Sequence, residues 1–587
     1  MISSGNLELA RLLSEIADFL ELKQESSFRV NAYRKGARAI EGLSEDVAAV
    51  AARGELRKIP GIGAGLADKI EEFLRTGAIA DHEALRGDLP AGLPELMTIP
   101  EVGAKTTLVL YRELGIADVG ALEQACRDGR VRALPRLGAR SEANILKGIE
   151  RRRQQGTRRP AYEVRPLLEA VIEGIRRMPG VEAVEVAGGL RRLRDTVADI
   201  DIVVATTDAP AAMAAVTALP QIGRVLAKGP TRASVLLGRV EIECDVRVVE
   251  PPSYGAALQY FTGSKEHNVR LRELAVRRGL RINEYGVYDV SPAPDAGAEG
   301  PPVAPGRRLG GRTEDEVYAA VGLPWIPPEI REGQGEIEAA QRGELPRLVT
   351  LQEIRGDLHM HTRWSDGKDT AETMARAAAA RGYAYCCITD HSPSLKFARG
   401  VTAHDLLAHA ASVRALSDAA GIRVLMGVEV DILGDGSLDY PDDVLAQLDL
   451  VVASVHSRFR MPRDEMTKRI VRALEHQHLD VLGHPTGRLI GERPPYDLDI
   501  DAVLEAARRT GTAIEINASP DRLDLPDVHV RRARERGVLV AIDTDAHQKA
   551  QLDFMPYGVG VARRGWMDAT HVINTWPLET LLEFLAR

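Results

Sequence analysis

The sequence predicts a multidomain protein of mixed α and α/β class, with a helical region at its amino-terminal end. At 587 residues the chain is too long for one hydrophobic core, so roughly three or more domains are expected. Between residues 6 and 52, apolar side chains such as Leu9, Leu13 and Ile16 recur at helical spacing. After residue 350, short apolar runs alternate with helical segments, which favours a parallel α/β architecture.

Composition and charge narrow the class of protein. The net charge is −9, so any nucleic-acid surface must be local. The chain has 4 cysteines and no CxxC pattern, which indicates a reducing cytosol without a disulfide framework or a cysteine-based zinc site. The opening 20 residues predict an amphipathic helix rather than a signal peptide, and no apolar run is long enough to span a membrane. We therefore expect a cytoplasmic monomer with no membrane partner.

Paired carboxylates mark the first candidate site, in residues 188–201 (GGLRRLRDTVADID). Asp199 and Asp201 lie two residues apart beside a β-rich run, so both side chains face the same way. Asp245 interrupts a second apolar run, 240–249, where an unpaired charge is costly to bury. Three such carboxylates can hold two divalent ions that activate a 3′-hydroxyl and stabilise departing pyrophosphate. Taken alone, Asp199 and Asp201 are better explained as solvated residues at an exposed strand end, and the surrounding motifs change that balance.

The phrases GGLRR…ADID, CDVRVV, YFTGSKEHNVRLR and RINEYG, in this order and spacing, resemble a family X DNA polymerase, the group that includes DNA polymerase beta. The resemblance implies a nucleotidyltransferase-like palm and a thumb. It implies gapped or primed DNA and deoxynucleoside triphosphates as partners, with Mn²⁺ or Mg²⁺ as cofactor. Asp199, Asp201 and Asp245 would form the catalytic, metal-binding triad.

The same resemblance implies a nucleotide site. Arg192 would contact the triphosphate, residues 260–263 would form a turn beside the sugar, and Asn268 and Arg272 would face the nascent pair and template. The full set of implied nucleotide-binding positions is Gly188, Gly189, Arg192, Ala198, Tyr260, Phe261, Gly263, Asn268 and Arg272.

Two positions depart from the family pattern. Gly189 stands where the family usually has serine, so a phosphate-binding hydroxyl is missing. Ala198 replaces a glycine, and its Cβ would crowd the approach of a phosphate to the backbone. We expect polymerisation that is slow or selective for its metal. The alternative is a degenerate polymerase that serves as a DNA-binding module.

Three glycine-containing turns predict helix-hairpin-helix motifs in the amino-terminal region. The phrase 59–63 (IPGIG) is followed by related phrases at 99–103 (IPEVG) and 134–138 (LPRLG). Glycine lets a phosphate approach the backbone, and free N–H groups at the next helix start favour the anion. The glycines expected to bind DNA are Gly61, Gly63, Gly103 and Gly138. Ordinary helix-turn-helix packing is the alternative.

The segment 28–35 (FRVNAYRK) resembles the part of the polymerase beta amino-terminal domain that binds a 5′-phosphate, which adds Tyr33 and Lys35 to the DNA-binding set. By the same resemblance, Lys69 stands at the position of a lyase lysine that forms a Schiff base. That chemistry needs an unprotonated amine and hence a lowered pKa. Gly65 replaces a phosphate-binding lysine of the family, and a plain surface lysine is the alternative for Lys69.

Histidines mark the second candidate site. Twelve of the 14 histidines lie from His359 onward, and several of them occupy phrases such as DLHMHT, TDHS, SVHS, GHP and DTDAH that follow short apolar runs. Residues at the carboxyl ends of successive strands gather on one rim of a (β/α) barrel. Mixed imidazole and carboxylate ligands suit Zn²⁺, Mn²⁺ or Fe²⁺, and the candidates suffice for two or three ions.

This combination resembles the polymerase-and-histidinol-phosphatase (PHP) family, with a distorted (β/α) barrel, over residues 350–587. The resemblance implies that water activated by bound metal attacks a phosphoester. Asp390 and Asn517 would orient the metal ligands. The implied ligands are His359, His361, Asp366, His391, Glu429, His456, His484, Asp545 and His547.

The predicted domains follow from these motifs. They are a lyase-like helical domain (1–90), a helical DNA-binding region (91–160), a palm (161–255), a thumb-like subdomain (256–328), a polar linker (329–350) and a PHP phosphoesterase (351–587). We also expect a basic hinge at 151–160 and a flexible loop at 290–311.

Together, the resemblances imply a DNA-directed polymerase for gap filling in DNA repair, joined to a 3′-5′ exonuclease. Removal of 3′-phosphates and cutting at abasic sites are further options for the PHP domain. A phosphatase of the histidinol-phosphate type is the other alternative, because a metal site alone does not distinguish substrates. The three hairpin motifs argue against it.

Overall fold

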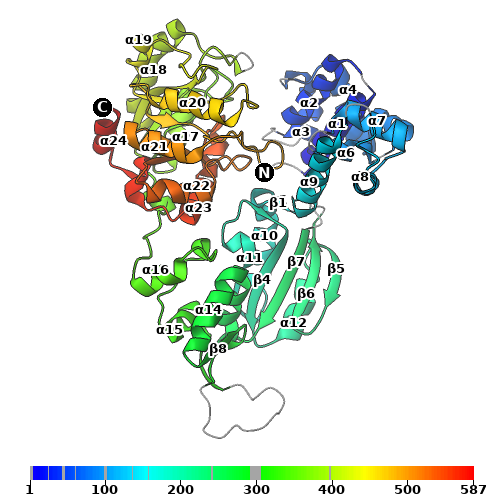
Figure 1. Ribbon diagram of the computed structural model, residues 1–587, viewed down its shortest axis with the longest axis vertical. Helices are drawn as coiled ribbons and strands as arrows, with labels where there is room; N and C mark the ends of the chain where they lie inside the picture. Colours follow the sequence, from blue (N-terminus) through cyan, green and yellow to red (C-terminus); the bar gives the residue numbers. More distant parts are fainter. Residues whose placement is uncertain are drawn as a thin grey trace. The chain divides into compact units, whose positions relative to one another are not determined.

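The computed structural model describes residues 4–586, except 24, 42–46, 60, 91, 98, 100–101, 135–136, 156–157, 239–241, 291–305 and 396–397. The chain forms two compact units, 1–157 and 158–587 (Figure 1). Most of the predicted loop 290–311 lies outside the described residues, as do the prolines of the three glycine turns. Among the described residues, no helix has the length and apolar character needed to cross a membrane.

The first unit is helical, as predicted. Its helices are α1 (Ser4–Leu22), α2 (Ser27–Glu41), α3 (Val47–Ala52), α4 (Ala64–Thr76), α5 (Ala80–Asp88), α6 (Leu93–Leu96), α7 (Ala104–Leu114), α8 (Val119–Arg127) and α9 (Ala139–Gln155). The stripe of Leu9, Leu13 and Ile16 on α1 is fully buried in a core shared by these helices. Half of the predicted hinge, 151–155, belongs to α9.

The palm begins the second unit. It comprises β1 (Arg159–Pro160), α10 (Ala161–Arg176), β2 (Val181–Val186), α11 (Gly188–Arg191), β3 (Thr196–Val197), β4 (Asp199–Thr206), α12 (Ala209–Val216), β5 (Ile222–Lys228), β6 (Arg232–Leu237) and β7 (Ile242–Val249). Five strands form one sheet in the order β2-β4-β7-β6-β5, and β4 runs parallel to β7. Ile200 and Ile202 of β4 join the core that includes α10 and α12. The side chain of Asp201, which lies between them, therefore faces the opposite side of the sheet.

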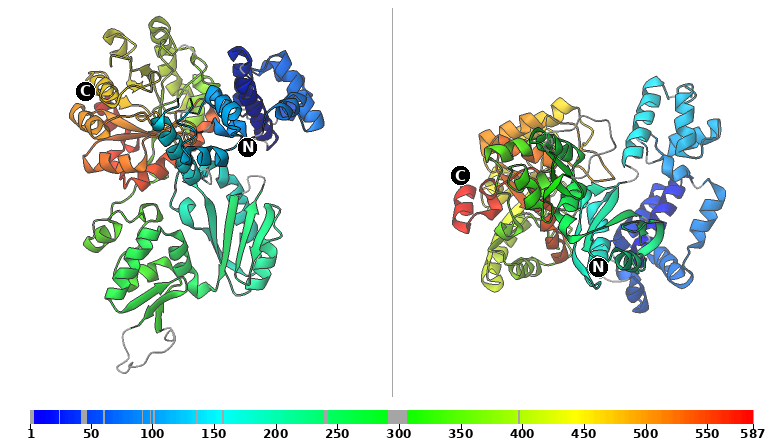
Figure 2. Two further views of the ribbon diagram at one scale, coloured as in Figure 1. Left: turned by 45° about the vertical axis from the view of Figure 1, so that its right-hand side comes forward. Right: turned by 90° about the horizontal axis from the view of Figure 1, so that it is seen from below.

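The thumb lies next to the palm sheet (Figure 2). It contains α13 (Tyr254–Thr262), α14 (Lys265–Arg277), β8 (Leu280–Asn283), β9 (Gly286–Asp289), β10 (Arg307–Gly310), α15 (Glu314–Ala320) and α16 (Glu336–Arg342). The predicted polar linker 329–350 is folded: it includes α16, and its Ile330 and Ile337 are buried in the thumb core. The polar residues of this segment outnumber the apolar ones that pack into the core, so its sequence looked like a linker. Trp566, from the far end of the chain, belongs to the same core.

The PHP region is a nearly closed barrel of seven parallel strands in sequence order. The strands are β11 (Gly356–Asp357), β12 (Tyr385–Ile388), β13 (Arg423–Asp431), β14 (Leu450–Ser454), β15 (Val481–Leu482), β16 (Ala513–Asn517) and β17 (Val540–Asp543). Helices lie between them: α17 (Ala371–Ala380), α18 (Ala403–Ala420), α19 (Asp442–Leu445), α20 (Arg463–Leu474), α21 (Ile500–Thr510) and α22 (Asp527–Glu535), with α23 (Met555–Arg564) and α24 (Leu578–Leu585) after the last strand. An isolated parallel bridge between Met360 and Ala546 joins the segments that follow β11 and β17.

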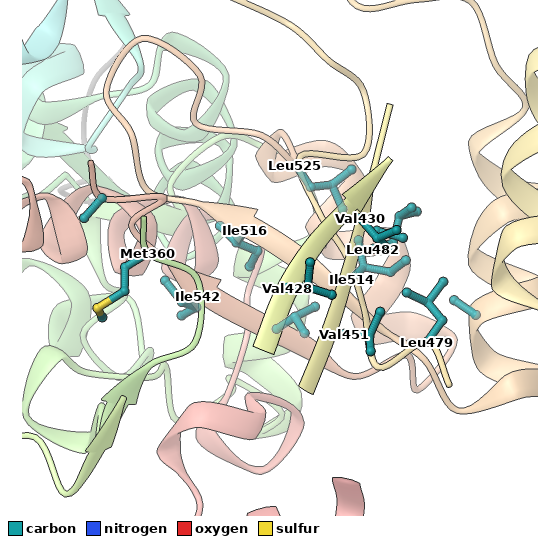
Figure 3. Close-up of a cluster of buried hydrophobic side chains, with 14 of the residues drawn as sticks. Met360, Val428, Val430, Val451, Leu479, Leu482, Ile514, Ile516, Leu525 and Ile542 are labelled. Atoms are coloured by element: carbon teal, nitrogen blue, oxygen red, sulfur yellow. The ribbon is translucent and has the colours of Figure 1, made fainter. Parts of the chain in front are cut away.

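Alternation along the strands builds two apolar layers in this barrel. Val428, Val430 and Ile514 belong to the larger buried cluster (Figure 3). This cluster also includes residues of the surrounding helices. Leu425 belongs instead to a second cluster with Leu581 of α24. Polar residues at the carboxyl ends of the strands are thereby held on a rigid frame.

Candidate active sites

The palm carboxylates lie on adjacent parallel strands. The register of β4 and β7 pairs Asp201 with Asp245, and Asp199 shares the face of Asp201. Burial raises the pKa of Asp201 to about 6, and the charges of Asp199 and Asp245 act in the same direction. Such like-charge repulsion is relieved by a bound cation.

Gly188 allows the backbone to reach this cluster. Its φ is +60°, and a Cβ added there would lie 2.5 Å from Oδ2 of Asp201. Only glycine combines that conformation with that close approach. The Gly-Gly start of the motif is therefore required by the carboxylates that end it.

Asp245 is oriented by neighbouring side chains. Arg232 Nη2 donates to Asp245 Oδ2 at 2.6 Å, Ser234 donates to Oδ1, and Arg247 lies 3.7 Å away. Within the described residues, the ligand-spaced groups of three or more side chains lie in the PHP barrel rather than here. The donor set of the palm still fits a divalent ion, because three carboxylate oxygens share one face of two paired strands.

A cavity of about 550 Å³ opens beside Asp199 and Asp201. The structure brings the predicted nucleotide-binding residues together around it: Gly188, Gly189, Arg192, Ala198, Tyr260, Phe261, Gly263, Asn268 and Arg272. The predicted turn at 260–263 is wrong in part, because Tyr260 and Phe261 form the last turn of α13. The turn itself starts at Gly263, whose φ is +70°.

Sequence reasoning missed several cavity residues, including Arg158, Arg194, Lys265 and Glu332. Glu332 accepts a hydrogen bond from Arg192 Nε at 3.0 Å, while Arg192 Nη1 donates to the carbonyl of Thr262. The basic run 191–194 offered a signal for Arg194. Glu332 lies in no motif, so nothing in the sequence pointed to it.

The PHP barrel gathers the predicted metal ligands at the carboxyl ends of its strands. Three groups have ligand atoms within 4.8 Å of one another: His361, Asp366, His391 and His547; His359, His361, Glu429 and Asp545; and His391, Glu429 and His456. His484 Nε2 reaches Glu429 Oε1 at 2.8 Å, which completes the predicted set of nine. Because Glu429 belongs to two of the groups and contacts His484, it lies at the centre of the cluster.

The donor atoms fit divalent metal. Among the described residues, the buried atoms His359 Nε2 and Glu429 Oε2 have no hydrogen-bond partner. Burial, followed by the charges of His547 and His391, lowers the pKa of His361 to about 4, whereas neighbouring carboxylates outweigh burial and raise the pKa of His359, His456 and His547. Neutral imidazole beside carboxylate is the donor set of zinc, manganese and iron sites.

Side chains behind the ligands orient them. His359 Nδ1 lies 2.6 Å from Glu515 Oε1, and His456 Nδ1 lies 2.5 Å from Asp431 Oδ1. Carboxylates in this position fix the ring and raise ligand basicity. Sequence reasoning assigned no role to Glu515 or Asp431, although both follow buried strand residues as the ligands do.

The two predicted orienting residues act differently from each other. Asn517 Nδ2 donates to Asp545 Oδ2 at 3.1 Å, so it contacts a ligand directly. Asp390 instead accepts hydrogen bonds from Thr362 N at 2.7 Å and from Ser365 Oγ at 2.5 Å. It therefore holds the loop that carries His361 and Asp366.

The glycine turns of the first unit start helices, as predicted. Gly63 and Gly103 are the N-caps of α4 and α7, with φ of −82° at both, and neither helix start has a side-chain cap. Gly138 directly precedes α9. Uncapped N–H groups behind a residue without a Cβ are suited to backbone phosphates.

A second cavity, of about 1000 Å³, is lined by Tyr33, Lys35, Gly61, Gly63 and Lys69. Lys69 Nζ lies 3.1 Å from Asp81 and 3.3 Å from Glu72. Burial lowers the pKa of Lys69, but these two carboxylates outweigh it and the net shift is upward. This pairing opposes the unprotonated amine that lyase chemistry needs.

Comparison with known proteins identifies the family of this chain. It is 40% identical over 582 residues, 99% of each chain, to the DNA polymerase/3′-5′ exonuclease PolX of Bacillus subtilis (strain 168). This chain belongs to the PolX family. Family patterns match a helix-hairpin-helix domain (4–79), a SAM-like helix-hairpin-helix tandem (93–151), the DNA polymerase beta thumb (257–332) and the PHP domain (357–519).

Part of this PolX family member is also similar to smaller proteins. A probable phosphatase of Thermoanaerobacter sp. (strain X514) is 32% identical over 231 residues, 37% of this chain and 89% of that protein. A probable phosphatase of Shewanella sediminis is 28% identical over 242 residues, 39% of this chain and 93% of its own length.

Proposed function

We propose that this chain fills short gaps in DNA during repair, with Asp199, Asp201 and Asp245 as the catalytic carboxylates. The observation that carries the proposal is the parallel pairing of β4 and β7, which sets three carboxylates on one face, two of which, Asp199 and Asp201, line a cavity with several arginines. Arg192, Arg194 and Arg272 supply the positive charge that a triphosphate requires.

The palm residues have separate roles in nucleotide transfer. Asp199, Asp201 and Asp245 would hold divalent ions, Mg²⁺ or Mn²⁺. When bound, such ions activate the 3′-hydroxyl and neutralise the departing pyrophosphate. Gly188 and Gly189 bring backbone N–H groups close to the phosphates, and Arg192 pairs with them. Tyr260 and Phe261 present the end of α13 to the sugar.

We further propose that the PHP barrel shortens DNA from its 3′ end. The nine ligands suit two or three ions of Zn²⁺, Mn²⁺ or Fe²⁺, which would supply an activated water for attack on a phosphodiester. Glu515 and Asp431 hold His359 and His456 in the tautomer that presents Nε2 to the metal. Asn517 donates a hydrogen bond to Asp545 and so restrains the orientation of its carboxylate.

The remaining parts of the chain would bring DNA to these sites. Residues 1–90 and 91–160 carry the glycine turns that grip the DNA backbone. Residues 161–255 and 256–328 form the palm and thumb, 329–350 connects them to the PHP domain, and 351–587 is the nuclease. We propose a monomer that acts in the cytoplasm on gapped DNA, where its free, buried cysteines remain reduced.

A labelled primer on gapped DNA, incubated with Mn²⁺ or Mg²⁺, tests both activities together. We expect Asp199→Ala to lose extension in the presence of nucleotides and to keep shortening in their absence. We expect His359→Ala to show the opposite pattern. Glu169→Ala and His404→Ala are matched controls, because both replace exposed side chains away from the two sites.

The outcome also separates the second candidate function. If wild-type protein shortens the primer but never extends it with either metal, the palm is a DNA-binding module that delivers a nuclease. Gly189 and Ala198 favour that candidate, because they remove a hydroxyl and add a methyl group at the cavity wall. Extension that survives Asp199→Ala would contradict the assignment of the carboxylates.

A further inference from the structure

One helix of the PHP domain, α23, contacts the palm beside the nucleotide cavity. α23 follows the segment that carries His547, and it passes the palm loop 192–195. A Cβ added to Gly560 of α23 would approach Leu193 Cδ1 to 3.2 Å. On the same loop, Asp195 Oδ2 accepts a hydrogen bond from Arg488 of the barrel at 2.8 Å. The loop that carries Arg192 is thus contacted by two parts of the PHP domain.

Arginines from the palm and the barrel converge on one carboxylate oxygen, Oε1 of Glu332. Arg192 Nε and Arg564 Nη1 each donate to this oxygen at 3.0 Å, and Arg194 Nη1 lies 3.7 Å away. Arg564 Nη1 also donates to the carbonyl of Arg192 at 3.0 Å. Its Nη2 donates to Asp527 at the start of α22. The end of α23 therefore touches both the main chain of Arg192 and the partner of its side chain.

The two arginines differ in their freedom to move. The side chain of Arg564 is 2% exposed, whereas those of Arg192 and Glu332 are each 15% exposed. Arg192 also lines the cavity. Arg192 can exchange Glu332 for phosphate oxygens, but Arg564 is enclosed and stays with Glu332. A buried carboxylate that loses its last cation is strongly destabilised, so the retained cation makes the exchange inexpensive.

We propose that Arg564 of the PHP domain is a positioning residue for nucleotide binding in the palm. It holds Glu332 and supplies the charge that Glu332 keeps when Arg192 turns to an incoming triphosphate. Without Arg564, the cations left to Glu332 in this cluster are Arg192 at 3.0 Å and Arg194 at 3.7 Å, so Glu332 holds Arg192 more tightly. The proposal rests on the role given above to Arg192. It assigns the polymerase reaction a residue that lies in the nuclease part of the sequence.

Steady-state gap filling separates this role from a structural one, because it reports KM for the nucleotide apart from kcat. We expect Arg564→Gln to raise KM about tenfold, the effect of about 1.4 kcal/mol, with kcat within about twofold of wild type. Glu332→Gln is expected to lower KM, because a neutral amide holds Arg192 less tightly. The double variant should resemble Glu332→Gln alone, since the competing carboxylate is gone.

Two further variants complete the test. Arg563→Gln is the matched control: this neighbour on α23 pairs with Glu329 at 2.9 Å and with the carbonyl of Val349, and we expect its KM to be unchanged. Arg564→Lys keeps the charge and should give a KM between wild type and Arg564→Gln. Shortening of 3′ ends by each variant shows that the barrel remains folded.

The outcomes that overturn the proposal are distinct from those that overturn the proposed function. The positioning role is refuted if KM is unchanged in Arg564→Gln. It is also refuted if the double variant raises KM as much as Arg564→Gln does. Arg192→Ala then decides what remains. If it raises KM, the cavity still binds nucleotide and only the link to Arg564 is lost. If it leaves KM unchanged, the assignment of the cavity and the positioning role are both wrong. Should Arg564→Gln not fold, Glu332→Gln tests the same competition, and a KM that does not fall refutes it.

Discussion

Glu314 is the carboxylate that fastens the palm to the thumb, and replacing it with glutamine gives a quantitative test of the fold around the nucleotide cavity. It accepts hydrogen bonds from both Nη atoms of Arg191, at 2.7 and 2.9 Å. It also accepts from Arg331 Nη1 at 2.6 Å and from Trp325 Nε1 at 3.0 Å. Arg191 belongs to α11 of the palm, and the other two belong to the thumb.

The magnitude follows from the pKa of this carboxyl. Burial alone would raise it, but the hydrogen bond of Arg191 and the charge of Arg331 lower it from 4.5 to about 2. At about 1.4 kcal/mol for each pH unit, this contributes about 3 kcal/mol of stability near neutral pH. Because the folded-state pKa is depressed, the contribution is complete above pH 4.5 and is lost as the pH falls through about 2.

Amide hydrogen exchange measures this contribution locally, which matters because a multidomain chain does not unfold in two states. In Glu314→Gln we expect exchange at α11 and α15 to be about 100-fold faster than in wild type at pH 7, after correction for intrinsic rates. The free-energy difference should fall by about half near pH 3. Exchange at α8, in the other compact unit, serves as the internal reference.

A conservative change at an exposed carboxylate provides the control. Glu182 lies 3.8 Å from Arg312 with both side chains more than half exposed, so Glu182→Gln should alter exchange by less than about twofold. The reasoning is refuted if α11 in Glu314→Gln exchanges within threefold of wild type at pH 7. A difference that is equal at pH 3 and pH 7 would also refute it.

Three more predictions address the individual sites. Glu515→Gln should weaken metal binding at the PHP barrel by about 10- to 100-fold, measured as metal retained against a chelator, and added Mn²⁺ should restore 3′ shortening. Lys69 should give little borohydride-trapped Schiff base at pH 7, and Asp81→Asn should increase trapping because it removes a carboxylate that raises the lysine pKa; equal trapping in both proteins would contradict this pairing. Gly188→Ala should abolish primer extension, because the added Cβ meets Asp201, whereas Gly180→Ala, with φ of +79° but a nearest neighbour at 3.6 Å, should retain it.

Most of the PHP ligands were predictable because they lie at or just beyond the ends of strands, whereas Asp366 lies in the loop between β11 and α17 and came from the family resemblance. The period of an apolar run locates the strand end, and the parallel connections bring all the ends to one rim. The palm carboxylates were predictable for a related reason. Asp199 and Asp201 lie at the start of one apolar run, and Asp245 interrupts a second apolar run. The register between those strands is a tertiary property, and the structure supplied it.

The errors share a cause as well. Tyr260 and Phe261 were placed in a turn by the resemblance to the polymerase family, yet α13 continues until Gly263 ends it. The segment 329–350 looked polar because charged residues separate its buried apolar ones and its helix is short. Glu332 and Arg564 were missed because they meet across 232 residues and belong to no local pattern. Contacts made by docking leave no periodicity in the sequence.

The membership of Trp566 in the thumb core has a consequence for the history of this enzyme. Trp566 is 3% exposed and packs with thumb residues such as Ile330, Leu348 and Tyr318, although the nuclease segment encodes it. A polymerase fragment that stops near residue 350 would open its own interior to water. A gene that lost its nuclease half could therefore persist only with compensating changes at that wall. The core of the thumb is thus completed by a side chain that the nuclease segment encodes.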